Sequence, residues 1–300
     1  MENILAFDWG GTNIKYALVD QNGKIINKNH APTPESLEDL FVFIERQLQE
    51  QLSKEVTGIA ISSPGSVAED GVIHGSSAIP YIHGPNMKDL IERRTGLPVH
   101  IENDANCAAL AEVWKGAASG KKDVAVVVIG TGVGGALIKD GMIHKGSHLH
   151  GGEFGYMILQ PAQLGNGMNT FSEVASTFSM IKRVAHQKGL DRSSLTGEEI
   201  FLKAEQGDNV CIQAISEFYQ MLAIGLYNIQ YIYDPEMILI GGGISDRKDL
   251  IYHLEEKMKC IVNKIDVATM MPVVNRCYLS ADSNLIGAVY HYLQKQLKSY

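Results

Sequence analysis

The sequence predicts an α/β protein of two similar domains, and three observations point to this class. A pattern of strand, glycine turn, strand, Asn/Asp-Gly turn and strand occurs over residues 4–29 and again over residues 123–144. The separation of about 120 residues is far longer than the repeat of a solenoid. The chain has 300 residues, 45% of them apolar, which is enough for two buried cores.

The first copy begins with an apolar strand that runs into Gly10-Gly11, a tight turn, and its second turn is Asn22-Gly23, a strong hairpin signal. Apolar residues then recur at helical spacing, and Gly96 is a typical helix stop. In chain order the predicted strands are residues 4–8, 14–20, 24–29, 56–62 and 98–102, and the predicted helices are residues 37–52, 87–95 and 104–115.

The second copy has its glycine turn at residues 130–135 and its hairpin turn at Asp140-Gly141. Chance similarity of two ordinary hairpins is the alternative, but both turn types match in the same order, which favours duplication. We expect one domain at residues 1–118 together with the C-terminal helix (284–300), and another at residues 119–283. The second half has predicted strands at 123–129, 136–139, 142–144 and 237–240 and predicted helices at 171–187, 210–233 and 284–297.

Composition excludes several classes of function. The net charge of −8 disfavours nucleic acid as a partner, because such affinity comes mainly from Lys and Arg on phosphates. The four cysteines form no C-x-x-C pair, so we expect reduced thiols in a cytoplasmic protein. The first residues lack the pattern of a signal peptide, and no apolar run approaches the roughly 20 residues of a membrane span. We therefore expect a soluble protein with no membrane partner.

Two glycine turns are candidates for holding phosphate. In Asp8-Trp9-Gly10-Gly11-Thr12 the glycines let backbone N–H groups approach an anion, and Asp8 could hold Mg²⁺ directly or through water. An ordinary hairpin turn explains this segment equally well. Residues 130–135 match G-x-G-x-x-G formally, but a strand follows where a dinucleotide site needs a helix, so a second phosphate-holding hairpin fits better.

Several carboxylates could act on a polyhydroxylated substrate. Asp104 follows a predicted strand and opens a helix, a place where it could serve as general base or simply cap the helix. Glu153 lies in a glycine-rich segment, and Glu173 lies at the start of a helix. Sugar hydroxyls require several fixed acceptors, although an isolated acid is more often solvated surface. His144, His148 and His150 suggest loop histidines rather than a metal site, because no second ligand cluster accompanies them.

Together and in this order, these motifs resemble the ROK family of sugar kinases and repressors over essentially the whole chain. The motifs are Asp8 to Thr12, Glu102-Asn103-Asp104-Ala105-Asn106, residues 130–135, Gly152-Glu153-Phe154-Gly155 and Gly241-Gly242-Gly243. The resemblance implies an actin/hexokinase-like fold, with two ribonuclease H-like domains around a central cleft. It also implies ATP and Mg²⁺ as cofactors and a homodimer as the assembly.

The resemblance assigns roles residue by residue. Asp104 would be the base that deprotonates the sugar hydroxyl, and Asp8 would be the magnesium residue. The sugar-binding positions would be Ser63, Pro64, Gly65, Asn103, Asp104, Glu153, Tyr156 and Glu173. The nucleotide-binding positions would be Asp8, Gly10, Gly11, Thr12, Asn13, Lys15, Thr131, Gly132, Gly134, Gly242 and Gly243.

Two departures from the family pattern bear on metal and substrate. Most members have a histidine after the Glu-x-Gly motif and a cysteine-rich zinc segment shortly afterwards. Here the histidine position is Tyr156, and residues 157–172 contain no cysteine, so we expect no structural zinc. The missing histidine contacts the anomeric end of the sugar in the family, so a free reducing glucose is a less suitable substrate.

Residues 153–157 and 103–107 resemble those of the bacterial beta-glucoside kinases of the same family. The resemblance implies phosphorylation of the 6-hydroxyl on the non-reducing glucose of cellobiose and related β-glucosides. Tyr156 could stack on the second sugar or aglycone. A glucokinase or other hexose kinase is the alternative, and a non-catalytic sugar-binding regulator is another. The family's repressors carry a winged helix before the first glycine motif, and only seven residues precede Asp8 here.

Overall fold

The computed structural model describes residues 2–51, 54–160, 169–279 and 282–298. These residues form two compact units. Unit 1 comprises Met1–Gly120, Lys145–Gly151 and Tyr278–Tyr300, and unit 2 comprises Lys121–His144 and Gly152–Cys277. The segment 145–151 thus groups with unit 1, although its position in the sequence led us to expect it in the second domain.

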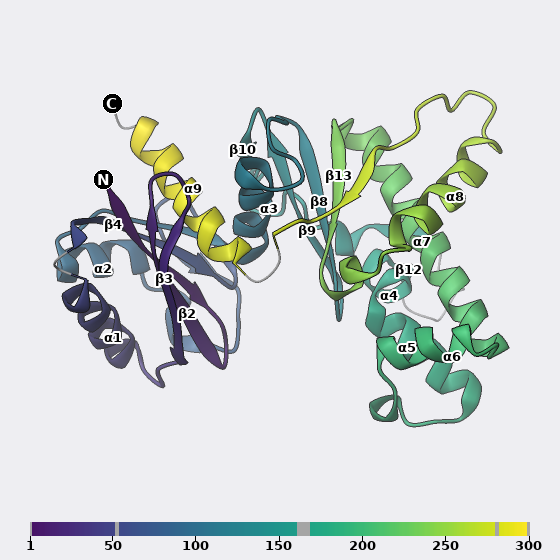
Figure 1. Ribbon diagram of the computed structural model, residues 1–300, viewed down its shortest axis with the longest axis horizontal. Helices are drawn as coiled ribbons and strands as arrows, with labels where there is room; N and C mark the ends of the chain where they lie inside the picture. The colour runs from purple at the N-terminus through teal and green to yellow at the C-terminus, as the bar shows by residue number, and fades with distance from the viewer. Residues whose placement is uncertain (1, 52–53, 161–168, 280–281, 299–300) are drawn as a thin grey trace. The chain divides into compact units, whose positions relative to one another are not determined.

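The centre of unit 1 is a five-stranded sheet in the order β3-β2-β1-β4-β7 (Figure 1). β1 pairs with β2 and β2 with β3 in antiparallel fashion, whereas β1 pairs with β4 and β4 with β7 in parallel. A separate two-stranded sheet joins β5 to β6. The strands are β1 (Asn3–Trp9), β2 (Asn13–Asp20), β3 (Ile25–Pro32), β4 (Val56–Ser63), β5 (Ser66–Val67), β6 (Ile73–His74) and β7 (Val99–Asn103).

Helices cover both faces of this sheet because successive side chains of a strand point to opposite sides. Leu5 and Phe7 of β1 share an apolar cluster with α1 and α2. Ile4 and Ala6 share another with α3 and α9. A Cβ atom on Gly287 would lie 1.7 Å from the carbonyl oxygen of Cys107, so close packing of α9 against α3 requires glycine there. The helices are α1 (Leu37–Glu50), α2 (Met87–Thr95), α3 (Asp104–Lys115) and α9 (Ser283–Lys298), and Pro80–Ile82 forms a 3₁₀ turn.

Unit 2 repeats the sheet of unit 1. Its strand order is β10-β9-β8-β13-β14, with β8 to β10 antiparallel and β8, β13 and β14 parallel. Because strand order and strand directions both match, the predicted duplication is confirmed. The strands are β8 (Val124–Ile129), β9 (Val133–Lys139), β10 (Met142–Ile143), β13 (Met237–Gly241) and β14 (Val274–Arg276), with a separate pair β11 (Ile158–Gln160) and β12 (Asn169–Thr170).

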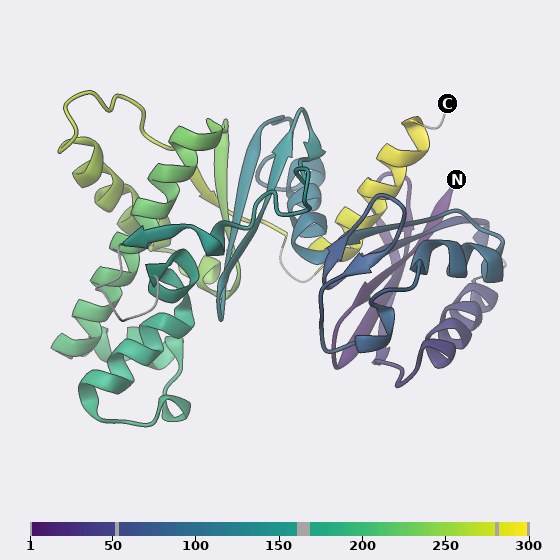
Figure 2. The ribbon, with the colours of Figure 1, turned by 180° about the vertical axis from the view of Figure 1, so that it is seen from behind.

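A largely helical layer packs on the sheet of unit 2 (Figure 2). Its central helix α7 is long and apolar enough to cross a membrane by length and composition, but Phe218, Leu222 and Leu226 lie in the core of the unit. We therefore interpret α7 as a core helix. The helices are α4 (Phe171–Ala175), α5 (Thr177–Lys188), α6 (Gly197–Glu205), α7 (Asn209–Tyr233) and α8 (Leu250–Val262), and 3₁₀ turns occur at Phe154–Tyr156, Arg192–Ser194 and Gly243–Asp246.

Two predicted elements of unit 2 differ in the structure. The helix expected over residues 171–187 is broken at Ser176, which has an extended backbone and whose side chain caps α5 by accepting from Ser179 N. The strand expected from residue 136 begins at Val133, because pairing with β8 continues through the glycines. α6, α8 and β14 were not predicted, although Thr196 and Glu199 form a capping box that marks the start of α6.

Candidate functional site

The parallel strands of unit 1 bring Asp8, Ser63 and Asn103 to the same edge of the sheet. Asp8 is 9% exposed, and its Oδ1 atom accepts hydrogen bonds from Ser62 Oγ (2.9 Å) and Asn284 Nδ2 (3.0 Å). Its Oδ2 atom lies 3.5 Å from the ammonium of Lys15, on the neighbouring strand. Asp8 is therefore held by three elements, with one oxygen beside an exposed cation.

The predicted first phosphate turn is an exposed turn between β1 and β2. Gly10 N donates to the carbonyl oxygen of Asn13 (3.1 Å), and a Cβ on Gly10 would lie 2.7 Å from that oxygen. A Cβ on Gly11 would lie 2.5 Å from the side chain of Ala78. Both glycines are thus required by close packing, while Gly11, Thr12 and Asn13 remain open to a ligand.

Asp104 is the first residue of α3, and it does not cap the helix. The N-cap is Asn103, whose Oδ1 accepts from Asn106 N (3.2 Å). Asp104 Oδ1 instead accepts from Ala105 N (2.8 Å) and from Asn103 Nδ2 (2.9 Å). Burial raises the pKa of Asp104 and the nearby Asp8 adds to this effect, whereas the hydrogen bond from Ala105 opposes it. A raised pKa suits a general base, because proton transfer is most effective when that pKa approaches the working pH.

The predicted sugar loop Ser63-Pro64-Gly65 lies beside this carboxylate. Asn103 Nδ2 donates to the carbonyl oxygen of Gly65 (3.0 Å) as well as to Asp104. Gly65 has a φ of 96°, and a Cβ there would lie 2.8 Å from the carbonyl oxygen of His74. The structure therefore brings Ser63, Pro64, Gly65, Asn103 and Asp104 together in unit 1.

The other predicted sugar residues, Glu153, Tyr156 and Glu173, lie in unit 2 and are exposed. Glu173 is held in a capping box, where its Oε2 accepts from Thr170 N (3.0 Å) and Thr170 Oγ1 (3.1 Å). Tyr156 is 73% exposed, so its ring is free to contact a ligand. A Cβ on Gly155 would lie 2.1 Å from the carbonyl oxygen of Val133, which explains the glycine between Glu153 and Tyr156.

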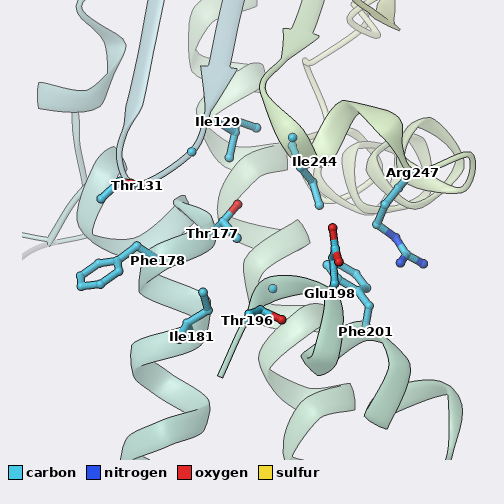
Figure 3. Close-up of a pocket in the computed structure, with 13 residues that line it drawn as sticks. Ile129, Thr131, Thr177, Phe178, Ile181, Thr196, Glu198, Phe201, Ile244 and Arg247 are labelled. Atoms are coloured by element: carbon cyan, nitrogen blue, oxygen red, sulfur yellow. The ribbon is translucent and has the colours of Figure 1, made fainter. Parts of the chain in front are cut away.

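A pocket of about 490 Å³ opens in unit 2 beside the second glycine turn. Figure 3 shows Phe178 and Ile181 on one side and Glu198, Phe201 and Arg247 on the other. The Arg247 guanidinium lies over the ring of Phe201 (3.9 Å) and forms two hydrogen bonds with the carboxylate of Asp249 (2.9 and 2.7 Å). The lining residues are Ile129, Gly130, Thr131, Thr177, Phe178, Ile181, Thr196, Gly197, Glu198, Phe201, Gly243, Ile244 and Arg247.

Apolar walls with a few polar groups suit the flat base of a nucleotide. Of the predicted nucleotide residues in unit 2, Thr131 and Gly243 line the pocket, whereas Gly132, Gly134 and Gly242 do not. Gly242 has a φ of 84°, and a Cβ there would lie 2.1 Å from the carbonyl oxygen of Ile129, so it serves the turn. Sequence reasoning missed Phe178 and Phe201, because amphipathic helices carry many such residues. It also missed Arg247, which lies in the loop after the 3₁₀ turn at Gly243–Asp246.

The described residues contain no group of three or more His, Cys, Asp or Glu side chains that could hold a metal ion. His150 Nδ1 instead contacts the carbonyl oxygen of His148 (2.6 Å). Residues 161–168, part of the segment where family members carry zinc ligands, lie outside the described residues. A single carboxylate such as Asp8 fits Mg²⁺, which usually keeps several waters and binds one or two carboxylates together with substrate phosphates.

The sequence model of the ROK family matches residues 4–295. The beta-glucoside kinase of Listeria monocytogenes is 37% identical over 98% of both chains, and that of Klebsiella pneumoniae is 36% identical over 97% of this chain and 96% of the relative. A glucokinase of Thermotoga maritima is 29% identical over 95% of each. Two or more kinds of sugar kinase thus align with nearly the whole chain.

Solved structures agree with this grouping. A ROK family protein from Streptococcus pneumoniae in complex with sucrose is 41% identical, with a TM-score of 0.91 over 99% of each chain. A ROK family glucokinase from Streptomyces griseus in complex with glucose and AMPPNP is 25% identical, with a TM-score of 0.71 over 96% of this chain and 98% of that one. The fold is therefore the actin/hexokinase-like fold of ROK sugar kinases.

Proposed function

Since this chain belongs to the ROK family and is a carbohydrate kinase, we propose that it transfers the γ-phosphoryl group of ATP to the 6-hydroxyl of the non-reducing glucose of a β-glucoside. The products would be ADP and a 6-phospho-β-glucoside. The observation that carries this substrate choice is the near full-length similarity to two beta-glucoside kinases, at 36–37% identity.

Asp104 is the proposed base. As the acceptor oxygen attacks the γ-phosphorus, the bond from that phosphorus to the β-phosphate oxygen breaks, and the hydroxyl proton passes to the Asp104 carboxylate. Asn103 orients this carboxylate through its side-chain amide, and the same amide holds the Ser63-Pro64-Gly65 loop. These fixed contacts favour transfer, because positioning supplies most of the catalysis in phosphoryl transfer.

Unit 2 supplies the proposed nucleotide site. The pocket of Figure 3 would take the base and ribose of ATP between the ring of Phe178 and the Phe201–Arg247 stack. Thr131 lies where the β8–β9 turn borders the pocket, so its backbone could follow the phosphates. Asp8 would hold Mg²⁺ through water, and the bound ion would neutralise charge on the transferred phosphate.

Tyr156 is the proposed determinant of a glycosylated acceptor. Its side chain is exposed and ends a turn that begins at Glu153, so it could stack on a second sugar or aglycone. The Streptococcus pneumoniae relative was solved with sucrose, which is a disaccharide. The second candidate function is a glucokinase, because glucokinases also match most of the chain.

A cytoplasmic location is part of this proposal. None of the four cysteines, all of which lie among the described residues, forms a disulfide. Intracellular thiols are usually kept reduced, and ATP is an intracellular cofactor.

ADP release with MgATP would test the function against cellobiose, gentiobiose, salicin, glucose, fructose and N-acetylmannosamine. We expect the β-glucosides to give the highest kcat/KM and the product to carry phosphate on the 6-hydroxyl of the non-reducing glucose. Preference for free glucose would support the glucokinase alternative instead. Failure of every sugar to stimulate ADP release would contradict sugar phosphorylation altogether.

A further inference from the structure

A fully buried carboxylate, Glu102, lies directly before the turn that carries Asp104. Its side chain is 0% exposed. Its Oε1 atom accepts from Asn103 N (2.8 Å) and from Asn106 Nδ2 (3.0 Å). Glu102 thus holds both ends of the first turn of α3, and any displacement of its carboxylate would be transmitted to Asn103 and to Asp104.

The other carboxylate oxygen of Glu102 faces Lys145. The Lys145 ammonium lies 2.9 Å from Glu102 Oε2, and the side chain is only 13% exposed. Lys145 comes from the segment 145–151, which belongs to unit 1 although the chain on either side belongs to unit 2. The ammonium also donates to the carbonyl oxygen of Val67 (2.9 Å) and lies 3.7 Å from Glu69 Oε1.

Val67 follows the predicted sugar loop by two residues, in β5. Lys145 therefore contacts both segments that frame Asp104: the end of β7 through Glu102, and the strand after Ser63-Pro64-Gly65 through Val67. Asn103 makes a second link between these segments, because its side-chain amide donates to both Asp104 and Gly65. Two sets of non-covalent contacts, one through Asn103 and one through Lys145, therefore hold the turn that carries Asp104.

The buried charge of Glu102 explains why a cationic side chain is required at position 145. His291 Nδ1 lies 3.6 Å from Glu102 Oε2, but burial lowers the pKa of His291 to about 4, so this ring is neutral at pH 7. Lys295 forms its ion pair with Glu69. Among ion pairs within 4.0 Å in the described part of the chain, Lys145 is the only lysine or arginine that reaches Glu102. Without it, a buried carboxylate would lack a permanent counter-charge, which is strongly unfavourable.

We propose that Lys145 is a positioning residue for phosphoryl transfer, acting through Glu102 and Val67 on the turn that carries Asp104. In this proposal Lys145 does not contact the substrate. It fixes the position of the Asp104 carboxylate. The inference rests on the proposed function for its kinetic consequence, but its structural consequence is independent of which sugar is used. Displacement of a reacting group by about 1 Å can cost on the order of 100-fold in rate.

The kinetic test compares Lys145→Met and Lys145→Arg with Lys28→Met, which removes an exposed ion pair with Asp282. Rates are expressed per nucleotide-binding site counted by ATP titration, so that unfolded protein does not contribute to the enzyme concentration used to calculate kcat. We expect Lys145→Met to lower kcat by about 10- to 100-fold with KM for ATP and sugar within about 3-fold, and Lys145→Arg to recover most of the loss. A kcat within 3-fold of the Lys28→Met value would overturn the proposal.

A second measurement needs no substrate. Hydrogen exchange of the peptide covering residues 102–107 should be faster in Lys145→Met than in Lys28→Met, and the double variant Lys145→Met/Glu102→Gln should be slower than Lys145→Met because no unpaired charge is left. Unchanged exchange in Lys145→Met would overturn the positioning role even if the wild type phosphorylates sugars. A wild type inactive on every sugar would instead refute the proposed function, and the exchange result would still decide the role of Lys145.

Discussion

Replacing Asp104 with asparagine should separate catalysis from stability. Asparagine has nearly the same shape, and its Oδ1 atom can still accept from Ala105 N and Asn103 Nδ2, so the turn should remain intact. The amide cannot take the proton of the attacking hydroxyl. A general base contributes roughly 10²- to 10⁴-fold, so we expect kcat to fall by that factor, equivalent to about 3–5 kcal/mol of transition-state stabilisation.

The same change should raise the stability of the protein at neutral pH. Because burial raises the pKa of Asp104 above the ordinary value of 3.8, the native state binds this proton more tightly than the unfolded chain does. Stability is therefore lost as pH rises from 3.8 through the raised native pKa, and asparagine removes that loss. The thermal midpoint of Asp104→Asn should exceed that of the wild type at pH 7.5, and the difference should shrink below pH 3.8.

The assay measures ADP release with saturating MgATP and cellobiose, and calorimetry gives the midpoints. The exposed Asp70 supplies the matched control, since Asp70→Asn makes the same chemical change outside the site. We expect the control to keep wild-type kcat. Retention of near wild-type kcat by Asp104→Asn would remove this residue from the base role. A thermal midpoint of Asp104→Asn below that of the wild type at pH 7.5 would show that the fold stabilises ionised Asp104. This result would contradict the prediction that burial destabilises the ionised form.

Four further predictions follow from individual residues. Tyr156→His should shift preference from cellobiose towards glucose by about 10-fold in kcat/KM with an unchanged thermal midpoint, since Tyr156 is 73% exposed; an unchanged preference would contradict the stacking role. Gly243→Leu should raise KM for ATP, because Gly243 lines the pocket, and should change the thermal midpoint little, because a Cβ there meets no protein atom within 4 Å. An unchanged KM for ATP would argue against the pocket as the nucleotide site. Burial lowers the pKa of His100 and of His291 to about 4, so stability should be lost as pH falls from 6.5 to 4, by up to about 3 kcal/mol for the buried His291. Chemical denaturation of His291→Gln should show a weaker pH dependence than that of the wild type, and an identical one would refute this assignment. Metal analysis of purified protein should find no zinc, because Tyr156 replaces the family's histidine and residues 157–172 contain no cysteine. Stoichiometric zinc would contradict this prediction.

Much of the secondary structure could be predicted because its causes are local. α2 and α3 have the predicted bounds because their end signals act within a few residues. These signals are the cap at Asn86, the left-handed Gly96 and the strand-to-helix junction at Asn103. The duplicated sheet followed from two turn signals in the same order. The break at Ser176 was not predicted, because the apolar residues on its two sides have the spacing of one continuous helix. Only the structure shows that Ser176 caps a second helix, α5.

The sequence by itself determined on which strands and turns the candidate site residues lie, because strand alternation, glycine turns and helix caps act over a few residues. Only the tertiary structure decided that Lys145 neutralises Glu102 and that Phe201 and Arg247 line a pocket. These facts depend on burial and on contacts between segments up to tens of residues apart. Local propensity carries no record of which side chains meet when such segments pack.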